Sequence, residues 1–383
     1  MTLHAASSMQ VMHIITGLGV GGAEMALLRL IGSGAATPGH TVVSMLRGGA
    51  LGPQFRAAGI SVLWLDFRSH PITSFLALRA HIRAVQPDIV HTWMYHADFV
   101  GGLTARLCGI KAVIWGIRQS SITGAPARPS LRLLYRACAW LSGRVPRVIV
   151  CCAHSALESH VAFGYAAGKM RVIHNGFDTE MLSPQHFDRE AARRSFGFEP
   201  STVVIGHVAR FSPEKDHLTF LDAARFALQQ HPHLRFMMIG RGVDVDNMVL
   251  TEAIRSFDLE RATLLLGERD DVAGCLAAMD IFCLSSRFEG FPNVLGEAMA
   301  MSVPSVTTDA GDARAIAGNA AKVVPCGDAR ALAAEFVRLA SLEPCERHLL
   351  GTRCRARITA TFDLAEMRRR FEKLYADISS NQD

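Results

Sequence analysis

The feature that most constrains the fold of this chain is a repeated alternation of short apolar segments with segments of helical length. In the first part of the chain, apolar and β-branched runs predict strands at 11–16, 40–46, 61–65, 88–92, 111–117, 146–152 and 170–174. Between them lie periodic segments, such as 73–85 and 97–108, whose length and pattern predict helices. This order predicts a mainly parallel sheet that is covered by helices on both faces.

The alternation restarts after a break at residues 174–187, which hold Gly, Pro, Asn and Asp and show little periodicity. Further strands are predicted at 202–208, 234–239, 262–266, 280–284, 304–307 and 321–324. A chain of 383 residues is too long for one ordinary core. We therefore predict an α/β fold with two doubly wound, Rossmann-like domains that face a central cleft. The domains are 1–175 and 176–363, and 364–383 forms a closing helix.

Composition limits the class of protein. The chain is 49% hydrophobic and 20% charged, which is typical of a globular protein. No apolar stretch reaches 18 residues, so no membrane span is predicted, and the first residues lack the pattern of a secretory signal. The nine cysteines form no C-x-x-C motif, which favours free thiols in a reducing cytoplasm.

The positive charge of the chain is concentrated in one stretch. No acidic residue lies between Asp98 and Glu158, and this stretch contains Arg106, Lys111, Arg118, Arg128, Arg132, Arg136, Arg144 and Arg147. Within 128–144, arginines alternate with Leu, Tyr and Trp. One interpretation is a packed helix with solvated arginines. The other is an interfacial surface at the inner face of the cytoplasmic membrane, which attracts anionic lipid and receives a lipid-linked acceptor.

A glycine-rich turn follows the first predicted strand. Gly17, Gly19 and Gly22 have the G-x-G-x-x-G spacing of the dinucleotide-binding fingerprint. That fingerprint needs an acidic residue about 20 positions further on, and none lies between Glu24 and Asp66. A nicotinamide-dependent oxidoreductase is therefore disfavoured. A tight turn without a ligand, or backbone amides that approach a phosphate or a sugar, remain as interpretations.

The most informative stretch is SSRFEGFPNVLGEAMAMSVPSV at 285–306, which follows a predicted strand. Glu289 lies in a loop with Gly and Pro, and Glu297 lies inside a helix that is predicted to begin near Asn293. A helix start after such a loop favours an anion, because its unpaired amides and its dipole point toward the ligand. From these positions Glu297 can accept hydrogen bonds from a ribose, and Glu289 can reach the hydroxyls of a sugar.

Two cations follow an earlier strand of the same predicted domain. Arg210 and Lys215 lie in VARFSPEKDHLTFLDAA at 208–224. Beside an anion-binding helix start, they would neutralise a pyrophosphate.

These motifs together resemble the retaining glycosyltransferases of family 4 (glycosyl transferases group 1), which have the GT-B fold. The matching segments are GGAE at 21–24, HNGFD at 174–178, ARFSPEKD at 209–216, IGRG at 239–242, AMD at 278–280 and SSRFEGFPNVLGEAMA at 285–300. Glu289 and Glu297 supply the E-x7-E pair of this pattern.

The resemblance implies transfer of a sugar from a nucleoside diphosphate, with a UDP-sugar favoured, to a hydroxyl of a polysaccharide or lipid-linked glycan precursor. It implies no metal, no resident cofactor and no nucleic acid. The catalytic set would be Glu289, Arg210 and Lys215. The donor would be bound by these three residues and by Gly19, Gly21, Gly22, Gly240, Glu268, Arg269, Gly290, Phe291, Asn293, Val294 and Glu297.

The acceptor side departs from the family pattern. Many relatives place a histidine at the end of a strand in the first domain, where VIWGIRQSS has Arg118. An arginine cannot act as a base, but it could bind an acceptor phosphate or assist the leaving group. His91 and His96 are the other acceptor-side candidates. A sugar-nucleotide epimerase or hydrolase of the same fold, and a catalytically silent sugar-nucleotide-binding subunit, remain as alternatives.

Overall fold

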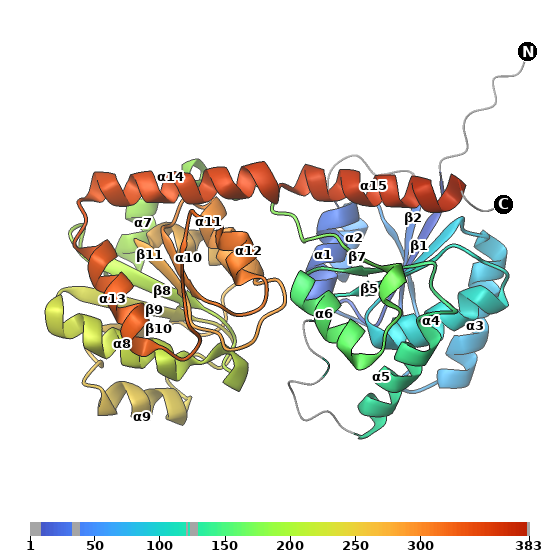
Figure 1. The fold of residues 1–383 in the computed structure, drawn as a ribbon, viewed down its shortest axis with the longest axis horizontal. Helices are drawn as coiled ribbons and strands as arrows, with labels where there is room; N and C mark the ends of the chain where they lie inside the picture. Colours follow the sequence, from blue (N-terminus) through green and yellow to red (C-terminus); the bar gives the residue numbers. More distant parts are fainter. Residues whose placement is uncertain (1–8, 33–38, 120–121, 123–128, 381–383) are drawn as a thin grey trace, which may run out of the picture. The chain divides into compact units, whose positions relative to one another are not determined.

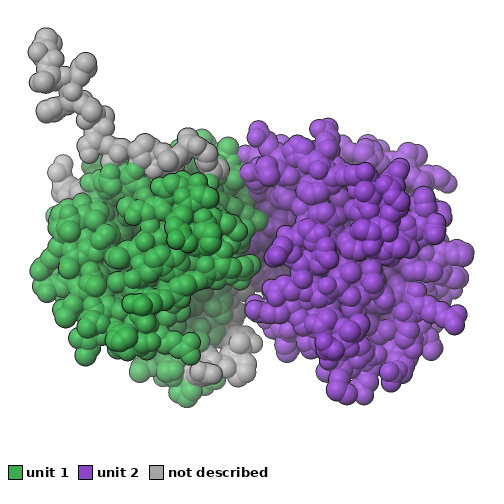
Figure 2. Space-filling view, turned by 180° about the vertical axis from the view of Figure 1, so that it is seen from behind, with its two compact units in different colours: residues 1–176, 364–383 green, residues 177–363 purple. Residues whose placement is uncertain are grey.

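The computed structural model describes residues 9–32, 39–119, 122 and 129–380. The chain forms two compact units, which Figure 2 shows in different colours. Unit 1 comprises Met1–Gly176 and Leu364–Asp383, and unit 2 comprises Phe177–Asp363.

Unit 1 is built on a seven-stranded sheet with the order β3-β2-β1-β4-β5-β6-β7 (Figure 1). The strands are β1 (Val11–Ile15), β2 (His40–Ser44), β3 (Ser61–Trp64), β4 (Ile89–Trp93), β5 (Val113–Ile117), β6 (Val148–Cys151) and β7 (Met170–Val172). Neighbouring strands are parallel throughout. Each predicted strand of this part of the chain is confirmed.

Helices cover the sheet of unit 1 (Figure 1). They are α1 (Gly22–Ile31), α2 (Gly52–Ala57), α3 (Pro71–Val85), α4 (Tyr95–Leu107), α5 (Pro129–Leu141), α6 (His154–Phe163), the short η1 (Ala167–Lys169) and α15 (Leu364–Ser380). α15 lies in the segment predicted as a closing helix, and it contributes to the core of this unit through Leu364, Met367, Phe371, Tyr375 and Ile378. The end of the chain thus completes the core that its beginning forms.

Unit 2 repeats this architecture with six parallel strands in the order β10-β9-β8-β11-β12-β13. The strands are β8 (Val203–Val208), β9 (Leu234–Ile239), β10 (Thr263–Leu265), β11 (Ile281–Leu284), β12 (Ser305–Thr308) and β13 (Lys322–Val324). They confirm the second series of predicted strands. Its helices are η2 (Pro184–His186), α7 (Arg189–Ser195), η3 (Pro213–Lys215), α8 (His217–Gln230), α9 (Met248–Ser256), α10 (Val272–Ala278), α11 (Asn293–Ala300), α12 (Ala313–Ala317), α13 (Ala329–Ala340) and α14 (Pro344–Thr361).

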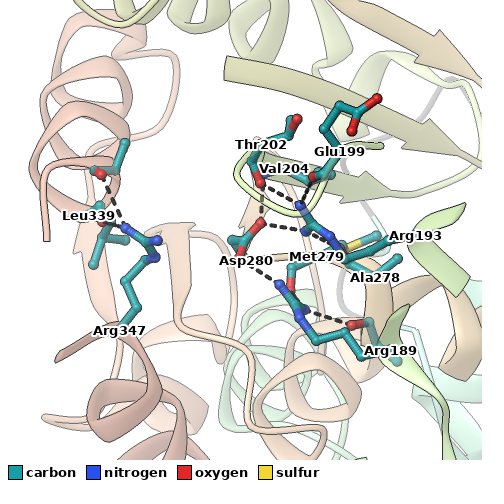
Figure 3. A network of polar contacts seen from close by, with 12 residues as sticks. Arg189, Arg193, Glu199, Thr202, Val204, Ala278, Met279, Asp280, Leu339 and Arg347 are labelled. Atoms are coloured by element: carbon teal, nitrogen blue, oxygen red, sulfur yellow. Dashed lines mark hydrogen bonds and ion pairs between the residues drawn. The ribbon is translucent and has the colours of Figure 1, made fainter. Parts of the chain in front are cut away.

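Asp280 of the AMD segment anchors the amino end of β11 (Figure 3). Its carboxylate accepts hydrogen bonds from Arg189 at 2.6 Å, from Arg193 at 2.8 Å and from the backbone N–H of Val204 at 2.8 Å. Arg193 is buried and also donates to the carbonyl of Thr202. One carboxylate therefore ties α7 to β8 and β11, which is a structural role.

Among the described residues, no helix is both long enough and apolar enough to cross a membrane.

Candidate functional site

The candidate donor site lies at the carboxyl ends of β8 and β11. These strands are neighbours in the sheet, although their connections run to opposite sides of it. Such a point is where doubly wound sheets bind their ligands. Arg210 and Lys215 follow β8, and Ser286 and Glu289 follow β11, so the fold brings together residues that are more than 70 positions apart.

Hydrogen bonds join the two loops that carry these residues. The Ser285 hydroxyl is within hydrogen-bond distance of the carbonyls of Lys215, at 3.1 Å, and Asp216, at 3.0 Å. In return, the backbone N–H of Arg287 donates to the carbonyl of Glu214 at 2.8 Å. The side chains at the tips of the loops are thereby held at fixed positions relative to one another.

Glu289 is the acceptor at the centre of this arrangement. The Lys215 ammonium and the Ser286 hydroxyl both donate to its Oε1, each at 2.6 Å. The side chain of Glu289 is only 9% exposed and that of Lys215 is 20% exposed. Both of these bonds go to Oε1, and Oε2, which has no hydrogen-bond partner among the described residues, is suited to the hydroxyl of a ligand.

Arg210 is more exposed and pairs with a carboxylate of its own loop. Its Nη2 donates to Glu214 Oε1 at 2.6 Å. Burial raises the pKa of Glu214, but the hydrogen bond from Arg210 and further polar contacts outweigh it, and the pKa lies below its ordinary value. Glu214 therefore holds Arg210 in position, and more than half of the side-chain surface of Arg210 stays exposed.

Helix α11 presents one narrow face to solvent beside this cluster. Of its residues, only Asn293, Val294 and Glu297 are partly exposed, and the rest are buried. Gly296 faces the opposite way, and a side chain there would overlap the ring of Phe177. No side chain caps the helix start at Pro292, so its backbone amides remain suited to an anion.

The segment before α11 contributes mainly its backbone. Phe291 is buried and its ring stacks against that of Phe177 at 5.9 Å, so this side chain belongs to the core. The carbonyl of Gly290 accepts a hydrogen bond from the N–H of Asp312. Among the predicted donor residues, these two are therefore placed as supports of the loop.

Three further predicted donor residues, Gly240, Glu268 and Arg269, follow the ends of β9 and β10. Gly240 has φ +147°, and a Cβ there would lie 2.1 Å from the carbonyl oxygen of Ala209. This contact requires glycine where the loop after β9 passes the loop after β8. Glu268 is exposed, whereas Arg269 is engaged by Asp271 at 2.6 Å.

In unit 1, the glycine-rich turn connects β1 to α1. Gly19 and Gly22 are exposed, and Gly21 caps α1 without a side chain. Glu24 lies in the first turn of that helix, and burial raises the pKa of its carboxyl. The turn thus exposes backbone next to a helix start, which is compatible with both interpretations of the sequence, a tight turn without a ligand and an approach to a phosphate or a sugar.

The acceptor-side candidates differ in exposure. His91 is buried, stacks on Trp93 and is hydrogen-bonded through Nδ1 to the hydroxyl of Tyr375 at 2.9 Å, so it is not placed to touch a substrate. Burial, followed by the charge of Arg118, holds its pKa well below the usual range. His96 is exposed in the first turn of α4. The sequence does not distinguish the buried His91 from the exposed His96. His91 lies in a strand, and a strand that is covered on both faces buries all of its residues.

The basic stretch is divided by the fold. Arg118 is partly buried at the end of β5, and Arg128 lies outside the described residues. On helix α5, Arg132, Leu133, Arg136 and Trp140 share an exposed face, with Leu133 69% and Trp140 66% exposed. The guanidinium of Arg144 covers the ring of Trp140 at 4.8 Å. This exposed apolar surface differs from a simply packed helix with solvated arginines.

A cavity of about 230 Å³ in unit 2 lies elsewhere, beside Asp280. Its lining includes Arg189, Met301, Pro304 and Arg347. It opens at the amino ends of the strands, and the donor-site residues do not line it.

Sequence reasoning did not identify Glu214 and Ser286 as members of the site. Both lie next to residues that it identified, within motifs that it quoted, but their importance comes from contacts across the two loops. A hydroxyl pair directly after a buried strand, as in Ser285 and Ser286, is the signal that could have identified the second of them.

The comparisons with known proteins agree with this geometry. Residues 202–341 match the family described as "Glycosyl transferases group 1", and residues 20–181 match "Glycosyltransferase Family 4". The chain is 24% identical to the UDP-Gal:alpha-D-GlcNAc-diphosphoundecaprenol alpha-1,3-galactosyltransferase of Escherichia coli, over 81% of this chain and 80% of that protein. It is 29% identical to the GDP-mannose-dependent alpha-mannosyltransferase of Mycolicibacterium smegmatis, over 73% of this chain and 69% of that protein.

The fold agrees as well. The crystal structure of Anabaena HepE in complex with UDP superposes with a TM-score of 0.83 and 19% identity, over 96% of this chain and 100% of that one. The two parallel-sheet units are therefore the Rossmann-like domains of the GT-B fold. The chain belongs to the family 4, or group 1, glycosyltransferases, and it is a glycosyltransferase.

Proposed function

We propose that this glycosyltransferase moves a sugar from a UDP-sugar to a glycan precursor linked to a lipid through phosphate, with retention of the anomeric configuration. The observation that carries the proposal is the cluster of Arg210, Lys215 and Glu289 beside the start of α11. The E. coli relative is named for a UDP-sugar donor and a diphosphoundecaprenol-linked acceptor, and HepE was crystallised with UDP. The mycobacterial relative is named for GDP-mannose, so the choice of base rests on the first two proteins.

Each group has a distinct part in the proposed reaction. Breaking the anomeric bond places negative charge on the departing pyrophosphate. Arg210, Lys215 and the amides of α11 stabilise that charge by preorganised electrostatics, at roughly 2–4 kcal/mol for each such contact. Glu289 is held in place by Lys215 and Ser286, which both donate to its Oε1. It acts as an acceptor for the hydroxyls of the sugar and as a support for Lys215.

A retaining reaction needs either a covalent intermediate or attack from the face of the leaving group. Oε1 of Glu289 is bound by Lys215 and Ser286, and Oε2 is assigned to the hydroxyls of the sugar. A hydrolase-like pair of carboxylates would need a second free group close by. We therefore propose front-face attack, in which the departing phosphate takes the proton of the acceptor hydroxyl.

The two glutamates are expected to respond differently to alanine. Glu297, on the partly exposed face of α11, is expected to bind the ribose, so Glu297→Ala weakens binding of both the nucleoside diphosphate and the nucleotide sugar. Glu289→Ala is expected to lower the rate of transfer and to affect UDP affinity much less. Loss of one charged hydrogen bond costs roughly 1.5–3 kcal/mol in the process that uses it. Calorimetry with UDP, together with transfer kinetics, measures both effects.

Glu289→Gln is the control, because it keeps an acceptor for Ser286 and removes the charge that faces Lys215. Loss of UDP binding in Glu289→Ala together with normal UDP binding in Glu297→Ala would reverse the placement of the donor.

We further propose that the protein works at the cytoplasmic face of an anionic membrane, which it meets through the exposed face of α5. Arg132 and Arg136 flank Leu133 and Trp140 on that face, and an exposed aromatic among arginines suits the level of lipid headgroups. The sequence has no acidic residue between Asp98 and Glu158, so no carboxylate from this stretch opposes the positive charge of α5.

This proposal predicts binding to vesicles of phosphatidylglycerol at low salt and release at high salt, because salt screens exposed charges. Arg132→Glu with Arg136→Glu should lower the vesicle affinity by about a factor of 10 or more, since each surface cation contributes about 1 kcal/mol. Arg56→Glu with Arg83→Glu, two exposed positions on α2 and α3, is the matched control. Sedimentation with neutral phosphatidylcholine vesicles to the same extent would contradict the proposal.

A further inference from the structure

Arg118, at the end of β5, carries a charge in unit 1 that no carboxylate of the described residues balances. Its guanidinium carbon lies 4.6 Å from the ring centre of Trp93 and 5.6 Å from that of Phe371. Both rings are fully buried. The guanidinium plane is therefore held by packing, in a position that an exposed arginine would not keep.

The hydrogen bonds of Arg118 leave most of its donors unused. Nη1 donates to Oδ1 of Asn175 at 2.9 Å. Nε and Nη2 are inaccessible to solvent and have no partner among the described residues. No aspartate or glutamate in the described part of the chain forms an ion pair with Arg118.

Such an arrangement is costly in a folded protein. Buried charges are normally paired and hydrogen-bonded, since their desolvation otherwise opposes folding. Cation–π contact with two rings offsets part of this cost, but it leaves the in-plane N–H donors unsatisfied. A guanidinium that has no counter-ion and has unpaired N–H donors in its plane is suited to bind an anion.

The place of Arg118 in the fold also favours a ligand. It follows β5 directly, at the carboxyl edge of the sheet. At the same edge, Met94 follows β4 with φ +72° and ψ 161°, in a region that residues other than glycine rarely adopt. The backbone N–H of Met94 donates a hydrogen bond to the carbonyl of Gly116 in β5, at 2.9 Å. Strain of this kind persists where the surroundings enforce it, and it is frequent at ligand sites.

We propose that Arg118 binds a phosphate group of the acceptor. The assignment rests on the proposed function, which supplies an acceptor linked to its lipid through phosphate. Nη1 and Nη2 form one edge of the guanidinium, and two phosphate oxygens match that edge. Asn175 holds Nη1 in the plane, and Trp93 and Phe371 fix the orientation of that plane. Arg118 is then a binding residue for the acceptor and takes no part in proton transfer.

Kinetics separate this role from packing. Arg118→Gln is expected to raise the KM for a phosphate-linked acceptor by about 10-fold or more, as loss of a charge-assisted contact implies. The KM for the donor should not change. An acceptor of the same sugar on a neutral alkyl glycoside should be used equally by the wild-type and Gln forms. An unchanged KM for the phosphate-linked acceptor would overturn the proposal.

Arg118→Lys and Arg83→Gln complete the set. The lysine variant keeps the charge without the planar fork, so its KM should lie between those of the wild type and the Gln form. It also serves if the Gln form does not fold. Arg83 is an exposed arginine of α3, and its replacement should change nothing. A lysine variant that is as impaired as the Gln form would assign Arg118 to packing.

A binding measurement distinguishes the acceptor phosphate from the donor phosphate. Replacing both Arg210 and Lys215 by alanine removes the two cations that are proposed to bind the donor pyrophosphate. In this double variant, inorganic pyrophosphate is still expected to raise the midpoint of thermal unfolding relative to sodium chloride of equal ionic strength. Adding Arg118→Gln should abolish that rise, and persistence of the rise would overturn the proposal. This measurement needs no transfer, so a failure of the proposed function would appear separately, as a wild type that transfers no sugar.

Discussion

Replacing either Arg210 or Lys215 by alanine is expected to lower kcat for transfer by a factor of about 10² or more, because the proposed mechanism assigns to each the stabilisation of charge on the leaving pyrophosphate. The structure gives the two residues different surroundings. Arg210 is more than half exposed and, within the described part of the chain, its one ion pair is with Glu214 of its own loop. Lys215 is largely buried against Glu289. Arg210→Ala is therefore expected to remove the proposed contact with the donor and little else.

Lys215→Ala should be the more damaging of the two. It leaves the carboxylate of Glu289, only 9% exposed, with Ser286 as its remaining donor. Lys215→Arg keeps the charge and should recover part of the activity. Lys322→Ala, at the amino end of β13, is the control and should have normal kinetics. Steady-state rates with saturating donor measure these effects. A near-normal kcat in both alanine variants would contradict the proposed role of Arg210 and Lys215 in transfer.

Asp280→Ala is expected to destabilise unit 2 by about 3–5 kcal/mol, because it leaves a buried arginine without its counter-ion. Arg193 is 5% exposed and reaches Asp280 at 2.8 Å (Figure 3). The same carboxylate also holds Arg189 and the first strand of the unit through Val204. Urea unfolding, followed by a probe within unit 2, measures the loss.

Asp309→Ala provides the comparison. It breaks an ion pair with Arg314 in which both side chains are well exposed, so its effect should stay within about 1 kcal/mol. If Asp280→Ala and Asp309→Ala lowered the free energy of unfolding by the same amount, the hydrogen bonds of Asp280 would stabilise the protein no more than a surface ion pair does.

The sheets of both units could be predicted from the sequence because parallel strands buried on both faces leave a strong signal. Runs such as VMHII and IFCL are apolar throughout, and the helices between them are long enough to show their period. The face of α15 was predictable for the same reason. These features depend on local sequence.

The remaining features depend on contacts that no local pattern encodes. Lys215 and Glu289 are 74 positions apart, and their pairing follows from the adjacency of β8 and β11. The burial of His91 and the packing of Arg118 between two rings depend on α15, which comes from the other end of the chain. Sequence reasoning identified Arg118 as an acceptor-side candidate and as part of the basic stretch, but it did not predict its burial, because charge alone does not indicate depth.

The central claim is sugar transfer from a nucleotide donor to an acceptor that carries phosphate, and acceptor-dependent release of UDP tests it most directly. The purified full chain is mixed with a UDP-sugar, with and without a short prenyl-diphosphate-linked sugar, and free UDP is measured over time. The account predicts release only when acceptor is present, matched by a product whose new bond has the anomeric configuration of the donor by NMR. Equal release with and without acceptor would indicate a hydrolase, and a product of inverted configuration would contradict the proposed chemistry.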